Sequence, residues 1–214
     1  MRAAELDYVP AFGKDFLLPF FDPVVKLFGA DRVRGMLLEG AQLQAGHRVL
    51  DLGCGTGTLA VAIKQRYPEV HVVGVDPDPK ALVRARRKTE RAAVSIQFDR
   101  GWAQTLPYAD DSFDRVISTL TLHHLSIEAK RSALCEAHRV LKPGGSLHVL
   151  DMAGDAPHER SRLPRWLHAA LHPSDNSANL ILQFIRDVGF KEPQNYASDR
   201  LLAEMMVEFY RATA

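Results

Sequence analysis

The sequence contains little cysteine and no long apolar run. Its two cysteines, Cys54 and Cys135, cannot form a disulfide framework, and neither lies in a C-x-x-C pair typical of redox or zinc sites. Charges interrupt every apolar run well short of about 18 residues, which argues against a membrane-spanning helix. The N-terminal MRAAELDYVP carries two acids where a signal peptide needs an apolar core. We therefore expect a cytoplasmic protein without stable membrane insertion.

Net charge is also nearly absent. Lysine plus arginine number 27 against 26 for aspartate plus glutamate, so the net charge is +1. Such a chain has no overall field to draw it onto nucleic acid. The basic residues of 80–91 are spread around a predicted helix, which indicates a solvated face. No nucleic-acid partner is expected, and no motif indicates an oligomeric state.

The 214 residues alternate short runs of branched apolar residues with stretches of helical period, a pattern that predicts βα repeats around a mostly parallel sheet. Strands are expected at Arg48–Leu52, His71–Val75, Val94–Phe98, Asp114–Thr119 and Ser146–Asp151. Helices are expected at Asp15–Phe28, Asp31–Leu43, Thr58–Tyr67, Lys80–Arg91, Ile127–Leu141 and Ala178–Val188. Residues 191–197 and 204–212 predict a terminal antiparallel hairpin. Ser126 is a candidate N-cap, and residues 142–145 predict a tight turn.

The strongest chemical motif is RVLDLGCGTGTLA, residues 48–60, in which an apolar strand ends near Asp51 and three alternate glycines lead into a helix. Glycine suits a sharp strand-to-helix turn that a ligand approaches closely, and we expect a side chain at Gly53, Gly55 or Gly57 to fill that space. A dinucleotide-binding loop would follow G-x-G-x-x-G, but position 58 is threonine. Asp76, nineteen residues after Gly57, can accept hydrogen bonds from both hydroxyls of a ribose. The loop and the acid together indicate an adenosine-type cofactor.

With these motifs and three others, the chain resembles the class I S-adenosylmethionine-dependent methyltransferases, in particular the small-molecule group that includes the quinone-biosynthesis C-methyltransferases. The resemblance covers roughly residues 43–151. The matching stretches are VLDLGCGTG, VVGVDPDP, LPYADDSFDRV, TLHHL and LKPGGSLHVLD. It implies an α/β fold with a single Rossmann-like doubly wound sheet of about seven strands, mostly parallel with a C-terminal antiparallel hairpin, and helices on both faces.

The resemblance also implies a cofactor site for S-adenosylmethionine, with S-adenosylhomocysteine as product. Gly53, Cys54, Gly55 and Gly57 would line its methionine and ribose side, Asp76 would hold the ribose hydroxyls, and Pro77 would lie beside the adenine. We assign Asp51, Ala103 and Thr119 to the same site.

Adenine recognition departs from the family pattern. Where relatives have an acid within Gly-Asp-Ala, this chain reads Gly101-Trp102-Ala103, and Asp99 lies two residues before the glycine. We expect Trp102 to stack on or edge against the adenine, a contact worth about 1–3 kcal/mol. The alternative is that Trp102 caps the core.

Two histidines and an acid are the candidates for chemistry. His123 and His124 follow the fourth strand, where ligands bind in open parallel sheets, and an imidazole suits a general base at neutral pH. We favour His124 slightly over His123. The pair could instead order the loop, and Asp151 is either a further candidate or a cap of the following turn. His168 and His172 lack a third ligand, so no metal is expected.

We interpret the chain as one domain. Its parts are an N-terminal helical cap (1–43), a cofactor-binding core (44–151), a helical substrate-side insertion (152–190) and terminal strands (191–214). The aromatic segment 8–28 and the segment 157–172, which contains Trp166, are hypothesised to form a lid over a small acceptor. The alternative is that both segments only cover the sheet.

The sequence thus predicts an enzyme that transfers a methyl group from S-adenosylmethionine to a small-molecule acceptor, apolar or ring-containing. One alternative is a non-catalytic S-adenosylmethionine-binding module. The other is an NAD-dependent oxidoreductase, which Thr58 and the downstream motifs disfavour.

Overall fold

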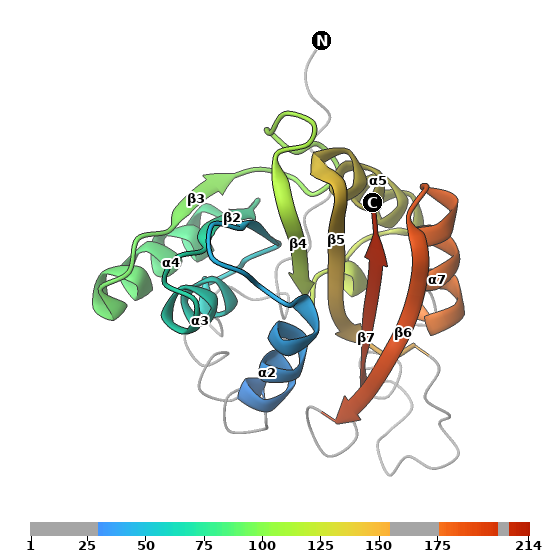
Figure 1. The fold of residues 1–214 in the computed structure, drawn as a ribbon, viewed down its shortest axis with the longest axis horizontal. Helices are drawn as coiled ribbons and strands as arrows, with labels where there is room; N and C mark the ends of the chain where they lie inside the picture. The colour runs from blue at the N-terminus through green and yellow to red at the C-terminus, as the bar shows by residue number, and fades with distance from the viewer. Residues whose placement is uncertain (1–29, 155–175, 201–205) are drawn as a thin grey trace.

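A computed structural model describes residues 30–154, 176–200 and 206–214. The predicted helix 15–28 and both segments of the hypothesised lid, 8–28 and 157–172, lie outside these residues. The described part forms one seven-stranded sheet in the order β3-β2-β1-β4-β5-β7-β6 (Figure 1). The first five of these strands are mutually parallel, and β7 pairs antiparallel with both β5 and β6. The predicted fold class is confirmed, including its C-terminal hairpin.

The strand bounds follow the predicted pattern closely. The strands are β1 (Arg48–Leu52), β2 (His71–Asp76), β3 (Gln97–Arg100), β4 (Phe113–Thr119), β5 (Leu141–Met152), β6 (Lys191–Arg200) and β7 (Met206–Thr213). The predicted start of the third strand at Val94 was wrong. The reason is that Ala93 adopts a left-handed conformation (φ 51°) and the Val94 amide donates to Thr89 O, so these residues still close the preceding helix.

The turn predicted at residues 142–145 lies inside β5. Leu141 pairs with Phe113 and Ser146 pairs with Arg115, so four residues stand opposite Asp114 alone. The irregularity accommodates the predicted turn within the pairing of β5 with β4, in the interior of the sheet.

Five helices and a short 3-10 turn occur in the described residues. They are α2 (Ala30–Ala41), α3 (Thr58–Arg66), α4 (Pro79–Ala92), η3 (Leu122–His124), α5 (Ile127–Val140) and α7 (Ala178–Asp187). Three of these helices have an N-cap side chain that accepts a hydrogen bond from a backbone amide of the first turn. Ser126 accepts from the Ala129 amide (3.3 Å), as predicted, and Asp78 accepts from the Lys80 amide (2.8 Å).

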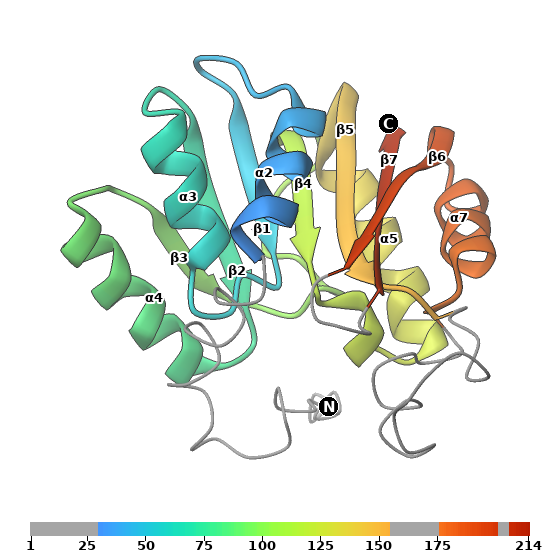
Figure 2. The ribbon, with the colours of Figure 1, turned by 90° about the horizontal axis from the view of Figure 1, so that it is seen from below.

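The helices cover the sheet on both faces, with α2, α3 and α4 on one face and α5 and α7 on the other (Figures 1 and 2). Each face buries its own apolar cluster. Strand side chains alternate between them: Val49 packs with Leu59 and Leu82, whereas Leu50 packs with Leu134. The two layers fix the strands so that the loops after β1, β2, β4 and β5 meet at one edge of the sheet.

The predicted solvated face of α4 is only partly correct. Lys88 Nζ donates to the Thr56 and Thr58 hydroxyls, and Arg86 donates to Phe98 O (2.8 Å). Lys88 therefore ties α4 to the glycine loop, a contact that helical periodicity alone did not indicate.

Candidate functional site

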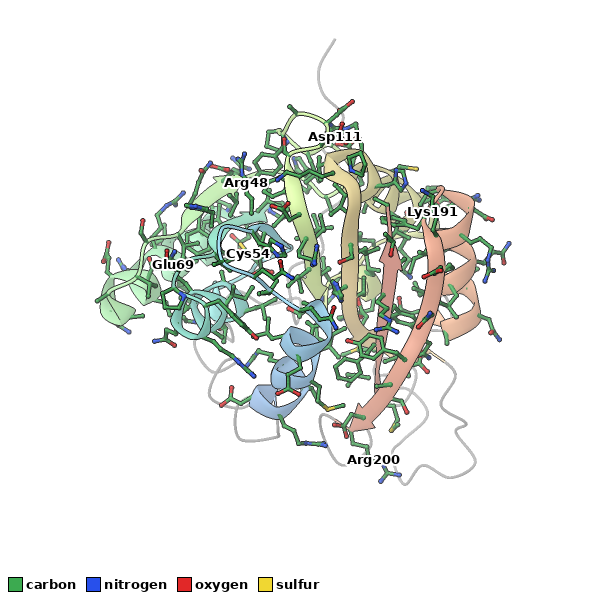
Figure 3. All side chains as sticks on the ribbon, in the orientation of Figure 1. Arg48, Cys54, Glu69, Asp111, Lys191 and Arg200 are labelled. Carbon is green, nitrogen blue, oxygen red and sulfur yellow. The ribbon has the colours of Figure 1, made fainter. Side chains whose placement is uncertain are left out.

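The loop between β1 and α3 is fastened to β2. The Gly53 and Cys54 amides both donate to Val75 O, at 2.9 and 3.0 Å. The Gly55 amide donates to Asp76 Oδ2 at 2.8 Å. The glycine loop and the strand-end acid that sequence analysis paired are therefore one hydrogen-bonded unit, marked by Cys54 in Figure 3.

The three glycines of this loop are needed for different reasons. All have positive φ, but a Cβ on Gly53 would lie 2.4 Å from Thr121, and one on Gly57 would lie 2.9 Å from the Ala85 Cβ. A Cβ on Gly55 would meet nothing within 4 Å. The expectation that a side chain at any of the three would fill ligand space was wrong for Gly53 and Gly57, where protein atoms already occupy it. Gly55 alone faces open space.

Alanine substitutions should separate these roles. Gly57→Ala is expected to lower the free energy of unfolding by about 1–2 kcal/mol for its positive φ and about 1–3 kcal/mol more for overpacking. Gly55→Ala should lower the free energy of unfolding only by the part due to its positive φ, and it should weaken binding of S-adenosylhomocysteine. Urea unfolding and calorimetry measure the two effects. Equal losses of stability would contradict this assignment.

Asp76 is 8% exposed and uses both carboxylate oxygens. Oδ2 accepts from Gly55 and Oδ1 accepts from the Asp78 amide at 2.9 Å. Burial raises the pKa of this carboxyl, and the two backbone hydrogen bonds lower it in part. Each oxygen keeps a second lone pair, so Asp76 can still accept hydrogen bonds from a diol.

Asp51 is the more unusual acid of the site. It is 0% exposed at the end of β1, and neither carboxylate oxygen has a hydrogen-bond partner among the residues described. Burial, followed by the nearby charge of Asp76, raises the pKa of Asp51 to about 7. A buried acceptor without a donor is costly unless a ligand supplies one. Its surroundings suit a cationic or hydrogen-bond-donating group of a ligand.

This raised pKa predicts a pH dependence of stability. Because the folded protein holds the Asp51 proton more tightly than the unfolded chain, stability should fall as pH rises from about 4 to about 7, by up to about 1.4 kcal/mol per unit. Asp51→Asn should remove this contribution and be more stable than the wild type at pH 8. Urea unfolding of the ligand-free protein at pH 5 and pH 8 tests it. Parallel pH profiles of the two proteins would refute the prediction.

The other predicted cofactor positions lie around the same edge. Pro77 directly follows β2, Trp102 and Ala103 follow β3, and Thr119 ends β4. Trp102 is partly buried and forms an isolated bridge with Thr105. Asp99 instead accepts from the Tyr108 hydroxyl (3.0 Å), which places its carboxylate in a contact within the protein.

His123 and Asp151 form a hydrogen-bonded pair at the carboxyl ends of β4 and β5. His123 Nδ1 lies 2.6 Å from Asp151 Oδ1, with the His123 side chain 9% and that of Asp151 0% exposed. The Leu122 and Met152 amides also donate to the Asp151 carboxylate, each at 2.7 Å. Burial alone would raise the pKa of Asp151, but His123 and these hydrogen bonds outweigh it and lower the pKa. An anionic Asp151 thus orients the imidazole.

His124 lies beside this pair without sharing its acid. Its ring centroid is 3.9 Å from that of His123, and no hydrogen bond of the His124 ring occurs in the described part of the chain. Loss of hydration around the ring lowers the pKa of His124, the neighbouring His123 lowers it further, and Asp151 opposes both effects in part. His124 is the weaker candidate base of the two.

Two further side chains of this edge escaped sequence analysis. Thr121 packs against Gly53 and donates to Thr119 O (3.1 Å), and Arg34 of α2 acts electrostatically on Asp51. Thr121 opens the TLHHL stretch, but that motif drew attention only to its histidines, and Arg34 belongs to no motif with a fixed spacing.

Metal and thiol chemistry find no support in the described ranges. No group of three or more potential ligands is gathered there. Cys54 is buried in the glycine loop, and burial raises the pKa of its thiol, which disfavours a nucleophilic thiolate. Within the same ranges, no helix has the length and apolarity needed to cross a bilayer.

The core of the chain is similar in sequence to known methyltransferases. Residues 49–145 match the methyltransferase domain family. A demethylmenaquinone methyltransferase of Thermus thermophilus is 40% identical over 138 residues, which are 63% of this chain and 62% of the relative. The chain thus matches less than two thirds of that relative's length.

Solved structures agree on the fold. The [4+2]-cyclase SpnF superimposes with a TM-score of 0.73 at 22% identity, covering 86% of this chain and 81% of SpnF. A phosphoethanolamine N-methyltransferase of Haemonchus contortus, solved with S-adenosylhomocysteine, superimposes with a TM-score of 0.68 at 16% identity, covering 85% of this chain and 52% of that one. Because one of these neighbours is named as a cyclase, the fold alone does not define the reaction.

Proposed function

We propose that this chain is a class I S-adenosylmethionine-dependent methyltransferase that transfers a methyl group from S-adenosylmethionine to a small-molecule acceptor. The observation that carries the proposal is the hydrogen bond from Gly55 to Asp76, which joins the open glycine loop to the strand-end acid. The match to a methyltransferase domain also removes the NAD-dependent alternative.

The residues present fit this cofactor. Asp76 would hold the ribose hydroxyls, the open face of Gly55 would admit the ligand close to the backbone, and the unpartnered Asp51 carboxylate would face its ammonium group. The bound cofactor supplies a methyl group on a sulfonium, an already activated carbon. The protein has mainly to align the acceptor and exclude water.

His123 is proposed as the general base of the reaction. With Nδ1 bonded to Asp151, the imidazole keeps Nε2 for a proton of the acceptor, and the buried carboxylate stabilises the imidazolium that forms. This arrangement replaces the earlier preference for His124, because Asp151 orients His123 and not its neighbour.

A base of this kind suits an acceptor with an acidic hydroxyl. Removing a phenol-type proton creates the nucleophile for O-methylation, and it also activates an adjacent ring carbon for C-methylation. The Thermus relative is named for a quinone precursor. We therefore propose a hydroxylated aromatic ring as the acceptor class. The hypothesised lid segments 8–28 and 157–172 lie outside the described residues.

One experiment tests transfer directly. The protein is incubated with methyl-labelled S-adenosylmethionine and a panel of hydroxylated aromatic compounds, and labelled products are identified by mass spectrometry. Calorimetry with S-adenosylhomocysteine and with NAD runs alongside. Adenosyl-ligand binding without any labelled product would favour the non-catalytic binding module, whereas no adenosyl-ligand binding would refute the proposed cofactor.

A further inference from the structure

A polar pocket lies on the sheet at the opposite end from the glycine loop. The pocket is lined by polar side chains of β4, β5, β6 and β7 and by residues 40–42 at the C-terminal end of α2. Figure 1 shows the position of α2 and of these strands. Arg115 and Ser146 lie near the amino ends of β4 and β5, whereas the proposed cofactor site lies at the carboxyl ends. The pocket therefore belongs to a different part of the molecule.

The strand register brings these side chains together. Arg115 pairs with Ser146, and Arg211 of β7 pairs with both His148 of β5 and Gln194 of β6. Directly paired residues have Cβ atoms about 4.5–5.5 Å apart on one face. The resulting cavity has a volume of about 180 Å³. One water molecule occupies roughly 30 Å³ in the liquid, so the cavity has room for a small ligand.

Neither arginine of the pocket forms an ion pair with a carboxylate of the described residues. Arg115 donates to the Ala41 carbonyl (3.0 Å) and to the Asp114 carbonyl (2.7 Å), and Arg211 donates to the Gln194 side-chain oxygen (2.9 Å). These acceptors are neutral, and no described carboxylate forms an ion pair with either guanidinium. The Asp114 carboxylate binds Lys142 instead (2.8 Å). The surplus positive charge favours an anion.

His148 adds an unsatisfied buried group to this pocket. The residue is 3% exposed, its Nε2 lies 2.9 Å from the Ser146 hydroxyl, and its Nδ1 has no partner within the described residues. Burial and the two arginines lower the pKa of His148 to about 3. The imidazole is neutral at pH 7, which leaves Nδ1 able to donate to, or accept from, a ligand in the pocket.

We propose that this pocket binds a phosphate group, free or as the terminal monoester of a small molecule, between the guanidinium groups of Arg115 and Arg211. A planar guanidinium binds phosphate oxygens through paired, charge-assisted hydrogen bonds. Glu192, an exposed residue, is the one acid among the lining residues and leaves a net positive charge. This site is independent of the proposed methyl transfer.

The test is a titration followed by NMR of the histidine imidazole signals and by calorimetry. Inorganic phosphate, glycerol 3-phosphate and chloride are added at matched ionic strength to the full chain. We expect saturable binding of phosphate that shifts the His148 signals. Arg211→Gln, at an exposed position, should weaken phosphate binding at least tenfold. Arg115→Gln should weaken it to a similar extent. Arg87→Gln, the same change of charge on the exposed face of α4, is the matched control and should bind normally.

The outcomes are distinct. Tighter binding of glycerol 3-phosphate than of phosphate assigns the site to a monoester, and the reverse assigns it to the free ion. Phosphate binding no better than chloride, or equal in Arg211→Gln and the wild type, overturns the proposal. Binding of S-adenosylhomocysteine, measured on every variant, shows that each is folded and keeps this result separate from the methyltransferase proposal.

Discussion

Replacing His123 by glutamine is expected to lower kcat for methyl transfer by about 10²- to 10⁴-fold, the usual contribution of a positioned general base. Glutamine can keep a hydrogen bond to Asp151 but cannot take up the acceptor proton. The affinity for S-adenosylhomocysteine should change little, because the glycine loop and Asp76 are untouched. Steady-state transfer from labelled cofactor at saturating acceptor measures kcat, and calorimetry measures the affinity.

His124→Gln is the matched control, since it changes the adjacent imidazole that lacks the acid partner. It should keep activity within a few-fold of the wild type. A double variant of His123→Gln with Asp151→Asn should be hardly slower than His123→Gln alone, because the two residues act as a unit. A loss on His124→Gln that equals the loss on His123→Gln would refute the assignment of the base.

Asp76→Ala is expected to weaken binding of S-adenosylhomocysteine by more than tenfold. Hydrogen bonds to a charged group contribute about 1.5–3 kcal/mol each, and this carboxylate also holds the Gly55 amide in the loop. Losing it therefore removes the ligand contacts and loosens the turn that presents them. Calorimetry gives the affinity, and thermal unfolding confirms that the variant is folded.

Asp99→Asn provides the control for this change. Asp99 lies in the neighbouring strand β3, one residue before its end, but its carboxylate accepts from Tyr108. Its substitution should leave the cofactor affinity within about twofold. If Asp76→Ala bound S-adenosylhomocysteine as well as the wild type does, Asp76 would have no part in the site.

The features predicted correctly from the sequence depend on neighbours along the chain. An apolar strand followed by alternate glycines specifies the β1–α3 turn by itself, and Asp76 follows β2 directly. The helix N-cap at Ser126 is likewise a contact across three residues. The family resemblance added the doubly wound sheet of about seven strands, and the local pattern of the tail added the C-terminal hairpin. The strand order was not predicted and comes from the structure.

The features that could not be predicted depend on side chains far apart in sequence. Asp151 selects His123 over His124 across 28 positions, and Lys88 reaches Thr56 across 32. Two adjacent histidines look the same in the sequence, and only the direction of each ring separates them. The start of β3 was misplaced because a left-handed alanine, which propensity does not foresee, prolongs the end of α4.

The three hydrogen bonds on Asp151 have an evolutionary consequence. Two of the donors are the backbone amides of Leu122 and Met152, so Asp151, the partner of the proposed base, is held by main-chain groups that any residue except proline can supply. The segment after Met152 can then diverge in length and composition while the imidazole keeps its direction. A lineage could acquire a new acceptor by exchanging that segment alone and inherit the proton-transfer apparatus unchanged.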